Sequence, residues 1–434
     1  MLIVISGKTC RTVNGYDVNF MDEYKRNIDA VIEDRLDDVS DDMVSGIQKD
    51  GRGNIAPITI ILPTLAMEAR DLVFSKVDKG EIVLDYFYDY CEGEYSNRNR
   101  ISEGVSYYAV KDVDYDTINE KNVIYDELRP YFVEEFKTIL EKHIRMCKDE
   151  LLERFKHIAS QSANSAVFMY DNSTMAGYHR EDGIQSALKH GTIVIGQLGL
   201  AETLEILIDC DHTTEYGMTL AKEIEQIYND LTAQFKKEYN MNFGVYYTPA
   251  ESLCHTAFVK WKDTYGDMEN VTYYIDEEGV RHDKEYFTNS IHVPVYKKMT
   301  PYEKIDIESQ LTGYSNAGSI TYVEVDGQII HNLKALEELV DYAMDKDIPY
   351  LAINLNNGGD MCEDCGYKGY IPGACHKCGS ENISRLRRVC GYLTGNYKQT
   401  TDKNGNVIRA GAFNKGKVCE TDQRVIHKKE MKFD

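Results

Sequence analysis

The 434-residue sequence has no apolar run of membrane-spanning length, which excludes a chain built around transmembrane helices. The apolar residues 2–5 are too few for a signal peptide and have no basic flank, so they predict a buried strand. With 42% hydrophobic residues, the chain has enough apolar content for a substantial core. We therefore expect a large protein of the cytoplasm.

Basic residues are also scarce, because 49 Lys and Arg face 72 Asp and Glu, a formal net charge of −23 at pH 7. Nucleic-acid phosphates repel such a charge and no basic stripe offsets it, so the composition argues against direct nucleic-acid binding. Much of the acidity falls in residues 17–50 and 76–126, which are rich in Asp, Glu and Tyr. We interpret both stretches as solvated helical or hairpin surface.

Four cysteines toward the C-terminus have the spacing of a metal site: Cys362-x-x-Cys365, then nine residues, then Cys375-x-x-Cys378. Each C-x-x-C turn aims two sulfurs at one point, so the four thiolates predict one structural Zn²⁺ in a zinc ribbon. Four glycines after or near the two pairs, Gly366, Gly369, Gly373 and Gly379, are expected to let the backbone turn tightly there. The alternative of two disulfide bonds is disfavoured, because nothing marks the chain as secreted and cytoplasmic thiols stay reduced.

Two short motifs follow the ribbon, RRVCGYL at 387–393 and FNKGK at 413–417. Together they resemble the radical loop of the glycyl radical enzymes. With a four-cysteine ribbon directly upstream, they resemble the anaerobic (class III) ribonucleotide reductase catalytic subunit. An α-carbon without a side chain can flatten between its amide neighbours and share an unpaired electron with both, whereas a Cβ would crowd the planar centre. The alternative for an isolated motif of this kind is a tight turn at a strand end.

The resemblance covers nearly the whole chain in collinear blocks. The blocks are GKTCRT (7–12), GRGN (51–54), ITIILPTLAMEA (58–69), GTIVIGQLGLAE (191–202), YTPAESL (247–253), YFTNSIHVPV (286–295) and NAGSITY (316–322). Full-length members have a long region before the thiyl cysteine, whereas Cys10 lies nine residues from Met1. The chain therefore resembles the C-terminal half of the enzyme. Because half a barrel exposes strand edges and one core face, we expect it to need a separately encoded N-terminal half.

The resemblance also implies a chemistry. Gly391 would carry a glycyl radical, which a radical-SAM activating protein with an iron–sulfur cluster generates. The radical would pass to Cys10, whose thiyl takes the 3′-hydrogen of a ribonucleoside triphosphate before the 2′-hydroxyl leaves as water. Formate is the usual reductant, the assembled enzyme is expected to be a dimer, and no other permanently bound cofactor is implied.

Four further residues are candidates for contact with substrate. Asn54 follows the thiyl cysteine and would hold substrate or formate, although a turn residue within 51–54 explains it as well. Glu251, Asn289 and His292 fall in blocks that line the site in the family, and they are candidates for ribose hydroxyls or phosphates. A satisfied core histidine or a helix cap is the alternative for these blocks.

The implied fold is α/β, the second half of a ten-stranded glycyl-radical-enzyme barrel. It would occupy residues 1–355, with insertions at about 17–50 and 76–126, followed by the zinc ribbon at 356–384 and the glycyl radical domain at 385–434. The residue patterns agree with alternating elements. They predict helices at 128–158 (with Pro130 in the first turn), 201–207 and 218–239, strands at 192–195, 244–247 and 320–325, and a hairpin turn at 403–406.

Three functions fit these features: a reductase catalytic half, another glycyl radical enzyme such as a formate-lyase type, and an inactive remnant of a split reductase gene. The ribbon before Gly391, and Cys10 without an adjacent second cysteine, favour the reductase. Intact Cys10, Gly391 and ribbon cysteines argue against a remnant, because a remnant has no reason to keep them together.

Overall fold

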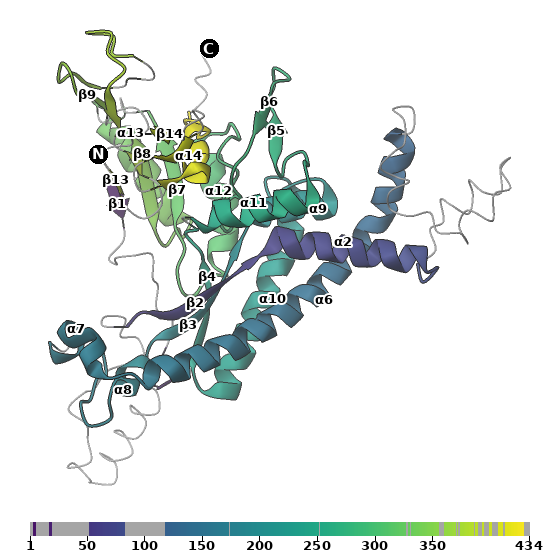
Figure 1. Ribbon diagram of the computed structural model, residues 1–434, viewed down its shortest axis with the longest axis vertical. Helices are drawn as coiled ribbons and strands as arrows, with labels where there is room; N and C mark the ends of the chain where they lie inside the picture. Colours follow the sequence, from purple (N-terminus) through teal and green to yellow (C-terminus); the bar gives the residue numbers. More distant parts are fainter. Residues whose placement is uncertain are drawn as a thin grey trace.

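Two groups of parallel strands and the helices around them form the centre of the computed structural model in Figure 1. The structure describes residues 3–5, 17–19, 52–82, 118–172, 174–250, 252–326, 329, 331–355, 360–369, 371, 374–385, 387–388, 393–394, 399–401, 407–410 and 413–428. Among the residues singled out above, Cys10, Gly391 and Glu251 lie outside this part of the chain, as do most of 17–50 and residues 83–117.

The first sheet has three parallel strands in the order β2-β3-β4. Their bounds are β2 (Asn54–Ile61), β3 (Thr192–Leu198) and β4 (Asn242–Tyr247). Every residue of the central strand β3 is buried, which suits its nearly continuous apolar sequence. The predicted strands at 192–195 and 244–247 are thus confirmed.

Long helices cross this sheet, as Figure 1 shows for α2, α6 and α10. They are α2 (Leu62–Asp78), α6 (Ile118–Ala159), α9 (Leu200–Ile208) and α10 (Glu215–Tyr239). Apolar residues at helical spacing face the core, as predicted. The buried ones include Phe132, Phe136, Ile139, Ile144 and Leu151 on α6 and Ile224, Leu231 and Phe235 on α10.

The start of α6 differs from our prediction. We placed Pro130 in the first turn, but the helix begins at Ile118 and Pro130 lies inside it. Proline removes one backbone hydrogen bond from a helix interior. The packing of the apolar face that follows, from Phe132 onward, outweighs that loss. Residues 76–78 and 118–126, which we assigned to an acidic insertion, are therefore parts of helices α2 and α6.

The second sheet has the order β1-β8-β7, with β7 and β8 parallel and β1 antiparallel to β8. Its strands are β1 (Ile3–Ile5), β7 (Thr321–Val325) and β8 (Leu351–Leu355), flanked by α12 (Pro301–Thr312) and α13 (Leu333–Asp345). The predicted strands near both 2–5 and 320–325 are confirmed.

The segment just before β7 joins the two sheets. Ala317 N donates to Val245 O at 3.0 Å, and Tyr247 N donates to Gly318 O at 3.0 Å, so residues 316–318 run along the edge of β4. A Cβ on Gly244 would lie 2.7 Å from Asn316 Oδ1 and 2.9 Å from Ala317 Cβ, so only glycine allows this approach. The parallel strands β2-β3-β4 and the parallel pair β7-β8 belong to two sheets, and residues 316–318, just before β7, link these sheets through hydrogen bonds to β4.

Shorter elements complete the part of the chain N-terminal to the ribbon. They are η3 (Ala163–Ala166), α7 (Val167–Asp171), α8 (Gln185–Leu188), α11 (Leu253–Tyr265), β5 (Tyr273–Ile275) and β6 (Arg281–Asp283). None of the helices in the described ranges is both long and apolar enough to cross a membrane.

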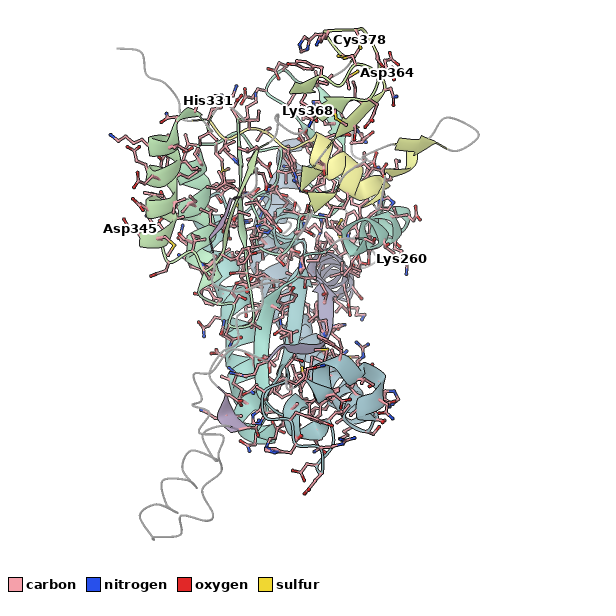
Figure 2. All side chains as sticks on the ribbon, turned by 90° about the vertical axis from the view of Figure 1, so that its left-hand side faces the viewer. Lys260, His331, Asp345, Asp364, Lys368 and Cys378 are labelled. Carbon is pink, nitrogen blue, oxygen red and sulfur yellow. The ribbon has the colours of Figure 1, made fainter. Side chains whose placement is uncertain are left out.

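The C-terminal elements are short strands and one helix. They are β9 (Asp360–Cys362), β10 (Lys368–Gly369), β11 (Ile383–Arg385), β12 (Arg387–Arg388), β13 (Leu393–Thr394), β14 (Gln399–Thr401), β15 (Val407–Ala410), β16 (Phe413–Asn414) and α14 (Lys415–Asp422). Strands β14 and β15 pair antiparallel on either side of the predicted hairpin turn, whose residues 403–406 lie outside the described part. Figure 2 shows Asp364, Lys368 and Cys378 together at one end of the molecule.

Candidate metal centre and active site

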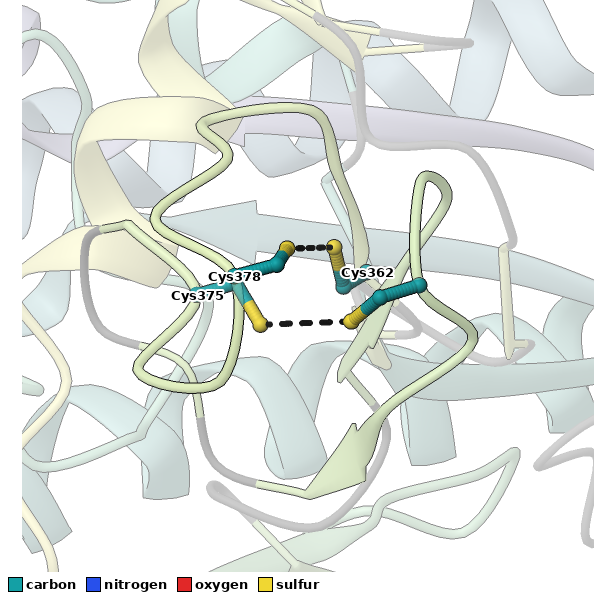
Figure 3. A group of neighbouring side chains, drawn as sticks. Cys362, Cys375 and Cys378 are labelled. Carbon is teal, nitrogen blue, oxygen red and sulfur yellow. Dashed lines mark hydrogen bonds between the residues drawn. The ribbon is translucent and has the colours of Figure 1, made fainter.

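The four ribbon cysteines converge on one point, as predicted. Their sulfur atoms all lie within 4.8 Å of one another and face in two pairs, Cys362–Cys378 at 3.4 Å and Cys365–Cys375 at 3.7 Å. Figure 3 labels Cys362, Cys375 and Cys378 of this cluster. These separations exclude disulfide bonds, and all four thiols are free. Four sulfurs bound to Zn²⁺ at about 2.3 Å would be separated by about 3.8 Å, so the cluster fits a tetrahedral zinc.

Two glycines shape the turns that present these sulfurs. Gly366 and Gly379 have φ angles of +70° and +75°, in the left-handed region that glycine adopts without strain. Gly366 N donates to Cys362 O at 2.8 Å and Gly379 N donates to Cys375 O at 2.6 Å, so both C-x-x-C-G turns close in the same way. The predicted convergence of the four cysteines is confirmed, and two of the four predicted glycines, Gly366 and Gly379, close the turns.

Polar and aromatic contacts hold the two turns together. Asp364 in the first turn accepts hydrogen bonds from Ser380 and Asn382, which follow the second turn. The ring of His376 packs edge-on against Tyr367 at 4.3 Å between centroids, so this histidine supports the ribbon rather than joining the four sulfurs. These contacts therefore link the two turns that carry the cysteines.

The candidate radical glycine follows the ribbon directly. Strands β12 and β13 pair antiparallel, with Arg388 opposite Leu393. Residues 389–392 connect the two strands, and Gly391 is among them. The strand pair begins two residues after β11 of the ribbon, and Gly391 itself lies outside the described residues.

Asn54 lies in a strand rather than in a turn, since it is the first residue of β2 and pairs with Thr192. Its Nδ2 donates to Ala317 O at 3.1 Å. Its Oδ1 is buried and has no hydrogen-bond partner among the described residues. A buried acceptor without a donor is costly, so this oxygen is suited to accept from a ligand.

Asn289 and His292 lie together at the other end of the first sheet. Asn289 donates through Nδ2 to Ala250 O at 3.2 Å, just beyond β4, and accepts from Lys417 Nζ at 2.9 Å. His292 Nδ1 lies 3.3 Å from Glu308 Oε1, which also pairs with Lys304 at 2.7 Å. Burial would raise the pKa of Glu308, but Lys304 and His292 outweigh it and hold that pKa well below its ordinary value.

A small cavity adjoins these two residues. Its volume is about 30 Å³, enough for a water molecule, and its lining includes Tyr286, Asn289, His292, Tyr322, Glu324 and Arg424. The structure therefore places Asn289 and His292 beside the C-terminal segment, and Asn54 at the amino end of the parallel strands. Asn54 belongs to a separate part of the sheet.

Sequence reasoning missed a buried carboxylate at the amino end of the first sheet. Asp17 is fully buried, and it accepts from His190 Nδ1 and from Asn242 Nδ2, both at 2.9 Å, with Arg52 Nε at 3.6 Å. Burial would raise the Asp17 pKa, but hydrogen bonds from His190 and Asn242 and the charge of Arg52 hold it below its ordinary value. Our expectation that residues 17–50 are solvated is therefore wrong for Asp17, which anchors the chain seven residues after Cys10.

A second buried pair was also missed. Glu202 and Lys284 are both fully buried, with Lys284 Nζ 2.6 Å from Glu202 Oε1. The same carboxylate oxygen accepts from Thr288 N at 2.9 Å and from Thr288 Oγ1 at 2.7 Å. Glu202 therefore fixes the start of the segment that carries Asn289. The only sequence signal was the presence of both Glu202 and Thr288 in the collinear blocks.

Comparison with known proteins agrees with this geometry. The sequence profile of a family described as "Anaerobic ribonucleoside-triphosphate reductase" matches residues 8–427. The anaerobic ribonucleoside-triphosphate reductase of Escherichia coli (strain K12) is 31% identical over 305 residues, which are 67% of this chain and 39% of the relative. The reductase of the same name from Enterobacteria phage T4 is 28% identical over 305 residues, 68% of this chain and 45% of the relative.

A solved structure titled "Anaerobic ribonucleotide reductase" shares the fold, with a TM-score of 0.51 at 16% identity over 87% of this chain and 46% of that chain. The chain spans about two fifths of the length of the curated relatives that it matches. The family profile covers almost all of its residues. The chain therefore belongs to the family of anaerobic ribonucleoside-triphosphate reductases.

Proposed function

We propose that this chain is the C-terminal catalytic half of an oxygen-sensitive reductase that converts ribonucleoside triphosphates to deoxyribonucleoside triphosphates. The observation that carries the proposal is the four-cysteine cluster directly before the strand pair that brackets Gly391, in a chain of this family. The cysteine cluster would hold a structural Zn²⁺, which supplies no step of the reaction and keeps the ribbon folded.

The proposed reaction moves one hydrogen atom at a time. A radical-SAM activating protein removes a hydrogen from the α-carbon of Gly391. The glycyl radical takes the hydrogen of the Cys10 thiol, and the resulting thiyl takes the 3′-hydrogen of the substrate. The 2′-hydroxyl then takes up a proton and leaves as water. Formate supplies the hydrogen and the two electrons of the new C2′–H bond and is oxidised to carbon dioxide, and Cys10 returns its hydrogen to C3′. A thiol suits this role because its S–H bond is close in strength to the ribose C–H bond.

Asn54 is our candidate for substrate contact at the amino end of β2. Its Nδ2 is already engaged by Ala317 O, whereas its buried Oδ1 has no described partner. A free acceptor suits a ribose hydroxyl, which can donate, better than a formate carboxylate, which can only accept. We therefore assign Asn54 to the sugar and leave formate to other groups.

We also propose that an N-terminal half completes the enzyme, which then works as a dimer. The parallel strands β2-β3-β4 and β7-β8, linked through residues 316–318, support half of a ten-stranded barrel, and the curated relatives are more than twice as long as the matched stretch. The shared interface would resemble a domain core cut in two, large and apolar. Among glycyl radical enzymes of other kinds, a four-cysteine ribbon before the radical loop is not expected, which favours the reductase.

An anaerobic CTP-reduction assay with formate tests the proposal. This chain, its complementary N-terminal half and their mixture are each supplied with the activating protein and SAM. We expect turnover in the mixture alone. Cys10→Ser should abolish that turnover while leaving the Gly391 radical and the zinc content intact, and the matched change Cys147→Ser, on α6, should leave turnover unchanged. A mixture that forms a complex and a radical but reduces no nucleotide would overturn the assignment.

A further inference from the structure

The C-terminal segment is docked on the strands by a network of buried charges. On the segment itself, Glu420 accepts from Lys417 Nζ at 2.8 Å and from Arg424 Nη2 at 2.9 Å. On the surface that faces the segment, Glu324 of β7 lies 3.4 Å from Arg424 Nη1. Asn289, in the loop between β6 and α12, accepts from Lys417 Nζ at 2.9 Å when its amide is oriented so that both of its polar atoms have partners. We call these five residues, Asn289, Glu324, Lys417, Glu420 and Arg424, the docking network.

The docking network is almost closed to solvent and balanced in charge. The side chains of Lys417, Glu420, Arg424 and Glu324 are between 1% and 8% exposed. Burial would raise the pKa of Glu420, but Arg424 and Lys417 outweigh it and hold that pKa at about 2. Two cations therefore match two carboxylates in a site where an unmatched charge would be very costly. Such a network favours one arrangement of the C-terminal segment relative to Asn289 and Glu324.

Backbone contacts continue the docking beyond the charges. Val425 N donates to Val295 O at 3.0 Å, and His427 N donates to Glu324 O at 2.8 Å. In return, Glu324 N donates to His427 Nδ1 at 2.9 Å. Burial lowers the pKa of His427 to about 3, so its ring is neutral and Nδ1 can accept. The segment after α14 is thus held against the edge of β7.

The first turn of α14 is equally constrained. A Cβ on Gly416 would lie 2.4 Å from Glu285 O and 2.5 Å from His255 Cβ, so the helix packs in direct contact with neighbouring backbone. A helix of eight residues is not stable alone in water. Its position therefore depends on this docking, and β16 leads into it without an intervening residue.

The stretch between β12 and β16 is consequently fixed at both ends, by the zinc ribbon at one and by the docking network at the other. We propose that Lys417 and Arg424 are positioning residues, which hold α14 and the segment after it against Asn289 and Glu324 and so fix the C-terminal end of the stretch that carries Gly391. This inference rests on the proposed function only in naming Gly391 as the group that is positioned. It gives Asn289 a structural partner in the C-terminal segment, in addition to any contact with substrate.

Hydrogen–deuterium exchange of the full zinc-loaded chain tests the proposal without requiring turnover. Arg424→Gln leaves Glu324 and Glu420 without their shared cation, so we expect exchange in residues 387–428 to rise about a hundredfold. Exchange in β2, β3 and β4 and the zinc content should not change. Arg424→Lys, which keeps the charge, should recover part of the protection.

Two further variants make the result decisive. Arg145→Gln removes the same i,i+4 contact with a glutamate, Glu141, but on the exposed surface of α6, and it should change nothing in residues 387–428. Glu324→Gln acts from the β7 side and keeps the side-chain volume, so it reports on docking even if Arg424→Gln does not fold. Unchanged exchange of 387–428 in Glu324→Gln would overturn the proposal. Uniformly faster exchange of all strands would also overturn it, because the network would then support the whole fold.

Discussion

Glu225 allows a test of whether a buried carboxyl group of this fold is protonated and makes the stability depend on pH. It lies on α10, fully buried against β3 and β4. Gln197 donates to its Oε1, and Tyr247 Oη lies 3.1 Å from its Oε2 and 2.7 Å from Leu311 O. A hydroxyl has one proton and the Leu311 carbonyl can only accept. A neutral Glu225 that donates to Tyr247 therefore satisfies all of these groups.

Burial raises the pKa of Glu225 from 4.5 to about 8, against its hydrogen-bonding contacts with Gln197 and Tyr247, which lower it. At about 1.4 kcal/mol per pH unit, this change corresponds to about 5 kcal/mol between the two protonation states. Because the folded pKa is raised, the folded chain holds the extra proton between pH 4.5 and 8. The free energy of unfolding should therefore fall as pH rises through that window.

Glu225→Gln removes this dependence, because the amide keeps the shape and both hydrogen bonds but cannot ionise. We expect similar stability to the wild type near pH 5, and a variant that is more stable by up to about 5 kcal/mol above pH 8. Urea unfolding under anaerobic, zinc-containing conditions from pH 5 to 9 measures the difference. The control is Glu238→Gln, on the exposed face of the same helix, which should follow the wild type. Stability curves for Glu225→Gln that stay parallel to the wild type would refute the reasoning.

Two further predictions concern the C-terminal region. Cys375→Ser should lower the bound zinc well below one per chain and loosen the ribbon, because three sulfurs leave one position of the tetrahedron open. Metal analysis that still finds one zinc per chain would contradict the assigned ligand set. Gly391→Ala should abolish both the doublet EPR signal of the activated complex and the backbone cleavage that air then causes there, because the methyl group crowds a planar radical centre. Cleavage that persists in the alanine variant would place the radical elsewhere.

Much of the local structure was predictable from the sequence because it depends on neighbouring residues. The ribbon is the clearest case, since the C-x-x-C spacing and the glycines after each pair determine both the sulfur positions and the turns. The strands around Thr192, Gly244 and Thr321 followed from short β-rich runs, and the buried face of α6 followed from helical spacing. The start of α6 did not, because tertiary packing after Pro130 overrode the usual preference of proline for a first turn.

Only the tertiary structure determined which charges are buried and what they contact. Asp17 belongs to an acidic stretch that composition assigns to solvent, yet it pairs with His190 and Asn242, more than 170 residues away. Arg424 belongs to no motif, and the FNKGK motif that ends at Lys417 does not indicate burial, but the two side chains meet Glu324 and Asn289 across the fold. A charged side chain has no periodicity that marks it as buried. Its burial is tolerated only where the connections between strands bring an opposite charge within reach, and local sequence does not encode that distance.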